Sequence, residues 1–170
     1  MSMTADEYTN GDRAPRVRVR EVAEADEPQW RQLFAAYRDF YRLTPDESVV
    51  DRVWGWLNDE GHELRGLVAL TDSAESAGRR GESIVGIGHF RRFARPSTGS
   101  VGLWLDDLFT APEARGLGAG SALIDQIRAE ASAQGCSVVR WITAEDNSTA
   151  RSLYDQLAVQ TNWVTYDTQP

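Results

Sequence analysis

Three glycines at alternate positions, Gly116, Gly118 and Gly120, separate an apolar segment from an amphipathic one. Glycine loses more conformational entropy on folding than any other residue, so such a run is favoured only where the backbone turns sharply or is closely approached. The segment that follows has helical periodicity, and the first turn of a helix offers unpaired N–H groups and the positive end of its dipole. We therefore interpret residues 115–121 as a diphosphate-binding turn.

The hydrophobic pattern of the remaining chain switches between the periods of strands and helices. β-forming or alternating residues predict strands at 16–22, 66–71, 83–93, 101–109, 137–143 and 163–166. Apolar residues at helical spacing predict helices at 30–41, 44–61, 119–134 and from 147 or 148 onward. This order predicts one α/β domain over residues 16–170. The polar residues 1–15 are expected to be a disordered tail.

Local patterns refine three of these boundaries. Thr44, with Glu47 three residues later, is typical of a helix start in which the threonine is the cap. The polar residues 73–82 between two predicted strands indicate a hairpin. Gly86 and Gly88 inside the second of these strands indicate a bulge or a closely approaching neighbour.

Composition excludes several classes of partner. A formal net charge of −8 and a pI near 4.8 make nucleic acid a poor partner, because its phosphates attract basic surfaces. The same charge favours a cationic substrate. No apolar segment is long enough to span a bilayer, so no membrane partner is expected. The single cysteine, Cys136, is interpreted as a small buried residue and not a nucleophile, and it fits a reducing cytoplasm.

The glycine turn matches neither of two familiar nucleotide motifs. A P-loop ends in a lysine followed by Ser or Thr, whereas this turn ends in Gly120, Ser121 and Ala122. A dinucleotide fingerprint begins directly after a strand and spaces its third glycine one residue further on. It also needs an acidic residue about twenty positions later, where this chain has residues 137–140. Both motifs are therefore rejected.

The pattern that remains is Arg-x-x-Gly-x-Gly, formed by Arg115, Gly118 and Gly120, followed by Asn147 and Tyr154. At these positions the chain resembles the GNAT superfamily of acyl-CoA-dependent N-acetyltransferases, with the spacing of its diamine acetyltransferase branch. The resemblance spans residues 16–167 and is densest over 103–154. It implies a single GNAT-like domain with a central, mixed, largely antiparallel twisted sheet, splayed at the cofactor site and flanked by about four helices.

The resemblance also implies where acetyl-CoA binds as co-substrate, without a metal. The backbone of residues 108–110 is expected to pair with the pantetheine arm, and the turn to cradle the pyrophosphate. The coenzyme residues so implied are Leu108, Phe109, Thr110, Arg115, Gly116, Leu117, Gly118, Ala119, Gly120, Ser121, Asn147 and Ala150. No His, Cys or carboxylate cluster has metal-ligand spacing.

Two residues are implied to carry the chemistry. Asp106 matches the acidic position of the diamine branch and is expected to be the base, with Glu145 or a water chain as alternatives. Tyr154 matches the family tyrosine that donates a proton to the leaving sulfur. In a regular strand Asp107 would point to the face opposite Asp106. His89 is interpreted as structural.

The implied reaction is acetyl transfer from acetyl-CoA, by direct attack in a ternary complex, to the primary amine of a small molecule such as a polyamine or amino acid. Two alternatives remain open: a protein or peptide acetyltransferase, and a non-catalytic CoA-binding module. The resemblance also allows a homodimer through the aromatic-rich strand at 163–166. The Gly-Phe pair that many members carry after the tyrosine is replaced here by residues 155–160, which leaves the acceptor geometry open.

Overall fold

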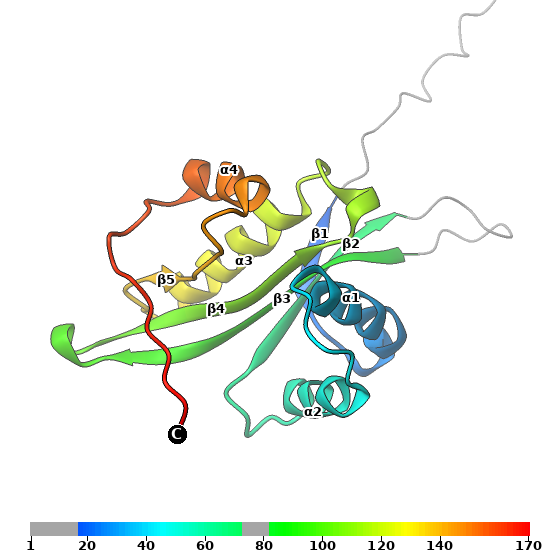
Figure 1. The fold of residues 1–170 in the computed structure, drawn as a ribbon, viewed down its shortest axis with the longest axis horizontal. Coiled ribbons are helices and arrows are strands. Elements are labelled where there is room, and N and C mark those ends of the chain that lie inside the picture. The colour runs from blue at the N-terminus through cyan, green and yellow to red at the C-terminus, as the bar shows by residue number, and fades with distance from the viewer. Residues whose placement is uncertain (1–16, 73–81) are drawn as a thin grey trace, which may run out of the picture.

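A five-stranded sheet forms the centre of the computed structural model, which describes residues 17–72 and 82–170 (Figure 1). Its strands are β1 (Arg18–Glu21), β2 (Arg65–Asp72), β3 (Glu82–Arg95), β4 (Ser100–Thr110) and β5 (Val139–Arg140), in that spatial order. Neighbours are antiparallel from β1 to β4, and β4 pairs with β5 in parallel. The mixed, largely antiparallel sheet expected from the sequence is confirmed.

In the described part of the chain, four α-helices accompany the sheet: α1 (Glu27–Phe40), α2 (Glu47–Leu57), α3 (Ala119–Ala133) and α4 (Ser148–Leu157). Alternation along β3 assigns α1 and α3 to opposite faces, because His89 contacts Trp30 of α1 while Gly88 faces Leu123 of α3. Short 3-10 turns precede α1 at Glu24–Asp26 and α3 at Pro112–Ala114, and a third, Pro96–Thr98, joins β3 to β4. The helices therefore enclose the sheet from both sides, as an α/β domain requires.

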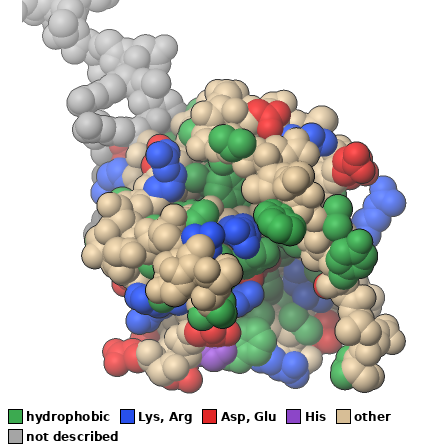
Figure 2. Space-filling view, turned by 90° about the vertical axis from the view of Figure 1, so that its left-hand side faces the viewer, with side chains coloured by type: hydrophobic (Ala, Val, Ile, Leu, Met, Phe, Trp, Pro, Cys, Tyr) green, Lys and Arg blue, Asp and Glu red, His purple; other side chains and the backbone are tan. Residues whose placement is uncertain are grey.

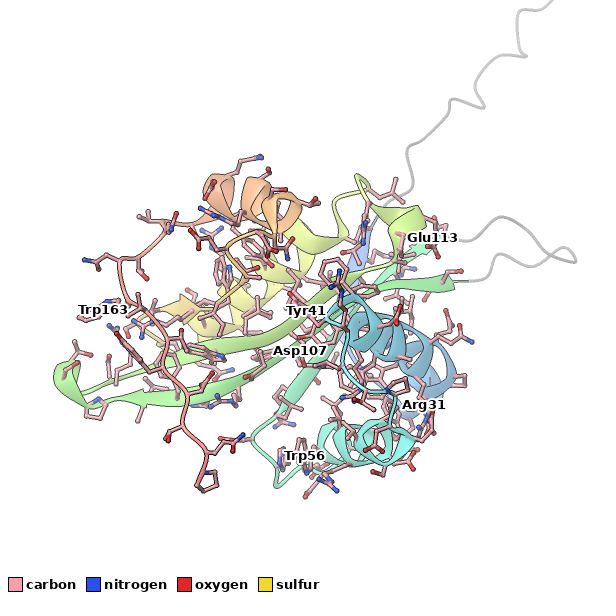
Figure 3. The ribbon with its side chains drawn as sticks, in the orientation of Figure 1. Arg31, Tyr41, Trp56, Asp107, Glu113 and Trp163 are labelled. Atoms are coloured by element: carbon pink, nitrogen blue, oxygen red, sulfur yellow. The ribbon has the colours of Figure 1, made fainter. Side chains whose placement is uncertain are left out.

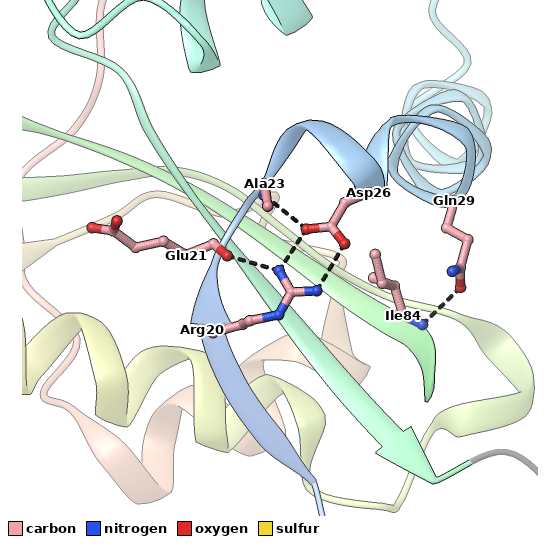
Figure 4. A network of polar contacts seen from close by, with 6 residues as sticks. All are labelled: Arg20, Glu21, Ala23, Asp26, Gln29 and Ile84. Carbon is pink, nitrogen blue, oxygen red and sulfur yellow. Dashed lines mark hydrogen bonds and ion pairs between the residues drawn. The ribbon is translucent and has the colours of Figure 1, made fainter. Parts of the chain in front are cut away.

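An ion pair fixes the start of α1 against the sheet (Figure 4). Arg20 of β1 donates two hydrogen bonds to the Asp26 carboxylate, at 2.6 and 2.8 Å, and the backbone N–H of Ala23 donates a third. Gln29 of α1 accepts a hydrogen bond from the N–H of Ile84 in β3. These contacts position the far end of α1, which reaches the candidate site.

Both sheet interfaces that involve β3 are irregular. Between β2 and β3 the register shifts at Ala69/Leu70. A Cβ built on Gly86 would lie 3.1 Å from the carbonyl oxygen of Phe109, so the close backbone neighbour predicted there is present. Between β3 and β4, His89 faces Asp107 and Phe90 faces Leu105, which leaves the intervening residue, Asp106, as a bulge.

Three sequence-based expectations are wrong. The strand predicted at 137–143 is only Val139–Arg140, and residues 163–166 form no strand, since the short β5 gives them no edge to pair with. The cap of α2 is Asp46 and not Thr44, because the Asp46 carboxylate accepts the N–H of Ser48 at 2.9 Å. The predicted tail at 1–15 and almost all of the loop at 73–82 lie outside the described residues.

Candidate active site

A cavity of about 600 Å³ lies at the end of β4, between the first turns of α3 and α4 and the end of α1. Its walls contain every residue that the sequence assigned to coenzyme binding except Leu117, which is 40% exposed, and they also contain Tyr154. Further lining residues that sequence reasoning missed are Phe40, Tyr41, Ala114, Thr149, Leu153 and Gln156. Segments more than a hundred residues apart in the sequence therefore line the same cavity.

The three glycines of the turn are required for different reasons. Gly116 and Gly118 have φ values of +82° and +86°, a backbone region that costs other residues about 1–2 kcal/mol. Gly120 has ordinary dihedrals, but a Cβ there would lie 3.1 Å from Leu153 of α4. Two glycines thus shape the turn, and the third lets α3 and α4 approach.

The first turn of α3, whose N–H groups have no acceptor within the helix, lies in the wall of this cavity. Gly118 is the N-cap and has no side chain to occupy those groups. Ala119, Gly120 and Ser121 follow it in the cavity wall, and Arg115 adds a cation. A diphosphate fits this arrangement, because both the helix dipole and the exposed N–H groups favour an anion.

The sheet opens beside the same cavity. Pairing between β4 and β5 covers only Leu103↔Val139 and Trp104↔Arg140, while β4 continues to Thr110. The backbone of Leu108, Phe109 and Thr110 therefore lines the cavity where β5 has already ended. Such a free strand edge can pair with an extended, amide-containing ligand, so a pantetheine arm fits here.

Asn147 caps α4 at the cavity wall. Its side-chain oxygen accepts the N–H of Ala150 at 3.3 Å, and its amide nitrogen lies 3.4 Å from Thr143 Oγ1. Both Asn147 and Ala150 line the cavity. The conformation of Asn147 is thus fixed by capping, whichever ligand groups it contacts.

Tyr154 lies one and a half turns into α4 and lines the same cavity. Its ring packs against Trp141 with centroids 5.3 Å apart. Burial, with a smaller contribution from Tyr41, raises the pKa of Tyr154 to about 12. The phenol is therefore protonated at neutral pH and able to donate a proton.

The bulge in β4 changes the geometry expected for the two aspartates. Asp107 contacts His89, and Asp106 lies 3.2 Å from Arg91, the next residue on the same face of β3. The expectation that Asp106 and Asp107 point to opposite faces is wrong, because a bulge interrupts the alternation of side chains. Both carboxylates face the α1 side of the sheet, and neither belongs to the cavity wall itself.

The two carboxyl groups differ in their ionisation. Burial raises the pKa of Asp106 above its ordinary value, although Arg91 opposes the shift. Burial acts on Asp107 in the same direction, but the hydrogen bond with His89 and the nearby Tyr37 hydroxyl outweigh it, so the pKa of Asp107 is lowered. Glu145, the alternative acid, is exposed in the loop before α4.

Tyr37 connects the end of α1 to these carboxylates, because its hydroxyl hydrogen-bonds Asp107; Figure 3 labels Asp107 and Tyr41 in the central part of the molecule. The Tyr37 ring lies 5.1 Å from that of Tyr41 and 6.2 Å from that of Phe109, which connects α1 to the cavity wall. Within residues 17–72 and 82–170, no group of three His, Cys, Asp or Glu side chains could hold a metal ion. No helix in this part of the chain is long and apolar enough to cross a membrane.

Comparison with known proteins identifies the family. The profile of the acetyltransferase (GNAT) family matches residues 27–158. The D-amino-acid N-acetyltransferase HPA3 of Saccharomyces cerevisiae is 24% identical over 151 residues, 89% of each chain. The thialysine N-epsilon-acetyltransferase of Bos taurus is 32% identical over 81 residues, 48% of this chain and 47% of that protein. The solved aminoglycoside N-acetyltransferase AAC(6')-Iy in complex with CoA has a TM-score of 0.72 at 17% identity, covering 93% of this chain and 97% of that one.

The family match includes all four α-helices and the strands between them, and the fold of the solved neighbour extends over nearly the whole chain. The cavity lies where β4 and β5 separate. The chain therefore belongs to the acetyltransferase (GNAT) family and is an acetyl-CoA-dependent N-acetyltransferase.

Proposed function

We propose that this enzyme acetylates the primary amine of a small cationic molecule, such as a polyamine or an amino acid, in a ternary complex with acetyl-CoA. The observation that carries the proposal is the β4 bulge, which turns Asp106 and Asp107 to one face beside the end of the coenzyme cavity. An acidic pair at that point favours a cationic acceptor, as does the net charge of −8.

In this proposal the coenzyme is held mainly by backbone. The N–H groups of the turn and of the first residues of α3 bind the pyrophosphate, with Arg115 and Ser121 beside them. The β4 edge over residues 108–110 pairs with the pantetheine arm, and Asn147 and Ala150 close the other side. Acetyl-CoA supplies an activated thioester, and the remaining steps belong to protein side chains.

Asp106 is proposed as the base. An alkyl ammonium with a pKa of roughly 10 must lose a proton before its nitrogen can attack. A carboxylate whose pKa is raised by burial is a stronger base than an exposed one and accepts that proton more readily, directly or through water. The nitrogen then bonds to the carbonyl carbon while the C–S bond breaks, and the acylated nitrogen releases its second proton, which restores the Tyr154 phenol directly or through water. The N–H of Leu108 polarises the carbonyl oxygen, and Tyr154 donates its proton to the departing sulfur.

The diamine branch remains the finer proposal for the acceptor. It is supported by the spacing of Arg115, Asn147 and Tyr154 and by the partial match to a thialysine N-epsilon-acetyltransferase. The match to a D-amino-acid N-acetyltransferase favours the amino-acid alternative. Both acceptors carry a primary amine on a small molecule, so one panel of amines distinguishes them.

The test is Tyr154→Phe assayed by release of the CoA thiol with a panel of diamines, amino acids and peptides. We expect kcat to fall about 100-fold with little change in the KM for acetyl-CoA, as for loss of a general acid. Tyr166→Phe is the matched control, because Tyr166 is 88% exposed in the C-terminal segment. Equal activity of Tyr154→Phe and wild type would contradict the role of Tyr154.

We include a homodimer in the proposal. The C-terminal segment exposes Val159 at 89%, Trp163 at 81% and Tyr166 at 88%. It lies on the side of the molecule viewed in Figure 2, where hydrophobic side chains gather between charged ones. A second copy would give residues 163–166 the strand partner they lack here. Sedimentation of wild type and Trp163→Ser at micromolar concentration tests this, with a monomeric wild type as the contrary result.

The predicted compartment is the cytoplasm. Cys136 is a free cysteine, which fits a reducing environment.

A further inference from the structure

A buried chain of polar side chains lies behind the acidic pair, and the proposed mechanism does not use it. The indole N–H of Trp30 in α1 donates to Nε2 of His89 at 3.0 Å, and Nδ1 of His89 lies 2.8 Å from Asp107 Oδ2. His89 and Trp30 are both 0% exposed. The Trp30 ring stacks on Phe34 and makes a tilted contact with Trp54, which holds it in place.

This chain of contacts determines which nitrogen of His89 carries the proton. An indole nitrogen only donates, so Nε2 of His89 must be the accepting, unprotonated nitrogen. The proton then lies on Nδ1 and points at Asp107. Trp30 thus selects the tautomer that donates to the carboxylate.

Asp107 is in turn accessible to a ligand. Its side chain is 23% exposed, whereas that of His89 is fully buried. From α1, the Tyr37 hydroxyl faces it, with Tyr41 next to Tyr37, and from β4 its neighbour is Asp106. Among the described residues no arginine forms an ion pair with Asp107, since Arg91 pairs with Asp106. The Asp107 carboxylate is therefore held in position by His89, and among the described residues no arginine is paired with it.

We infer that His89, with its tautomer set by Trp30, is a positioning residue that holds Asp107 as the anionic anchor for the ammonium group of the acceptor. The inference rests on the proposed function and divides the work of the acidic pair. Asp106 takes up the proton of the reacting amine, while Asp107 stays ionised and binds the positive charge of the acceptor. Two neighbouring carboxyl groups with opposite environments are the usual basis for such a division.

The tautomer can be measured without any enzyme assay, because the chain has two histidines. Two-bond nitrogen–proton correlations of the imidazole rings distinguish Nδ1–H from Nε2–H forms. His62 Nδ1 accepts the N–H of Leu64 at 3.1 Å, so its neutral form carries the proton on Nε2 and serves as an internal reference. We expect opposite tautomers at the two residues; an Nε2–H form at His89 would overturn the inference.

Two variants of His89 separate positioning from packing. In His89→Asn the amide N–H₂ falls near the position of Nδ1 and can still donate to Asp107, whereas in His89→Gln the amide lies near Nε2. We expect His89→Gln to raise the KM for the amine about 10-fold with kcat and the KM for acetyl-CoA much less changed, as for loss of a charged hydrogen bond. His89→Asn should restore most of the wild-type KM. Equal losses in both variants would overturn the positioning role.

Asp107→Asn gives an independent test if His89 variants fail to fold. Removing the charge should raise the KM for a cationic amine about 10-fold or more. It should leave acetyl-CoA affinity, measured by calorimetry, unchanged. If the wild type acetylates the amine and Asp107→Asn has the same KM for it, the inference is contradicted while the proposed function stands. Absence of transfer to every amine by wild type would instead contradict the proposed function, and the histidine tautomers would still be measurable.

Discussion

The two sides of the candidate site use different chemical groups, main-chain groups on one side and side chains on the other. On the proposed coenzyme side, the groups expected to face the ligand are mostly backbone, presented by Gly116, Gly118, the start of α3 and the free edge of β4. On the acceptor side they are side chains, Asp106 and Asp107, whose directions depend on a bulge and on partners from β3 and α1. Backbone sites require particular residue types at fixed spacing, while side-chain sites depend on contacts distant in sequence.

This difference between the two sides explains why the acetyl-transfer chemistry follows from the family, whereas the acceptor substrate is a proposal. The proposed pyrophosphate cradle is made of backbone, so it depends on the glycine spacing and tolerates change elsewhere in the sequence. The acceptor side can change through single side chains without disturbing that cradle. The predictions below test whether the two sides are independent.

The largest effect is expected on the acceptor side. Asp106→Asn should lower kcat about 10²–10³-fold near neutral pH, because the amine loses its base. At high pH, where the free amine deprotonates in solution, the deficit should shrink. The measurement is kcat against pH by thiol release, with Asp125→Asn as control, since Asp125 forms an exposed pair with Arg128. A fall of less than threefold would assign the base to Glu145 or to a water chain.

The coenzyme side should respond to backbone strain and not to charge. Gly118→Ala is expected to weaken acetyl-CoA binding about 10-fold, because alanine is strained by 1–2 kcal/mol at positive φ and shifts the turn. Gly99→Ala is the matched control: its φ is +59°, and no atom lies within 4 Å of the added Cβ, as at Gly118. Both variants should lose similar free energies of unfolding, but calorimetry should show weaker binding only for Gly118→Ala. Equal affinity in the two would remove the turn from the coenzyme site.

A smaller, directional effect is expected from Arg91→Gln. Arg91 lowers the pKa of Asp106, so its removal should raise that pKa further. Since the base works deprotonated, the acidic limb of kcat/KM against pH should move to higher pH. Activity below neutrality should then fall a few-fold, the scale of one partly exposed charge pair. Arg92→Gln, whose side chain hydrogen-bonds Gln134, is the control; a shift toward lower pH would contradict the assignment.

The smallest effect on catalysis is expected far from both sides. Asp26→Asn should reduce stability by about 1 kcal/mol, because the Arg20 side chain, 42% exposed, can be solvated when the charge of the buried Asp26 is removed. The pKa of Asp26 is lowered on folding, chiefly by hydrogen bonds from Arg20. Wild type should therefore gain this stabilisation above the unfolded-state pKa and lose it as pH falls toward the folded-state value. Urea unfolding from pH 3 to 7 should show that acid loss in wild type and not in the variant, with kcat/KM unchanged.

The same comparison explains what could be predicted from sequence. Four of the six strands, the helices and the glycine turn could be predicted, because hydrophobic periodicity and glycines at positive φ leave local signatures in the sequence. The bulge at Asp106 leaves none, so the direction of Asp107 was predicted wrongly. The contact of His89 with Trp30 joins residues 59 positions apart and has no local signature. The strand predicted at 163–166 failed for a related reason, since a strand needs a partner that composition alone does not supply.

The most direct test of the account is product analysis with the purified enzyme, acetyl-CoA and equimolar diamine, amino acid and peptide acceptors. The account predicts that thiol release is matched by acetylation of a small cationic amine, detected by mass spectrometry, and that this activity falls in Asp106→Asn. Acetyl-CoA binding without acetylation of any free amine, or acetylation of the peptide alone, would contradict it.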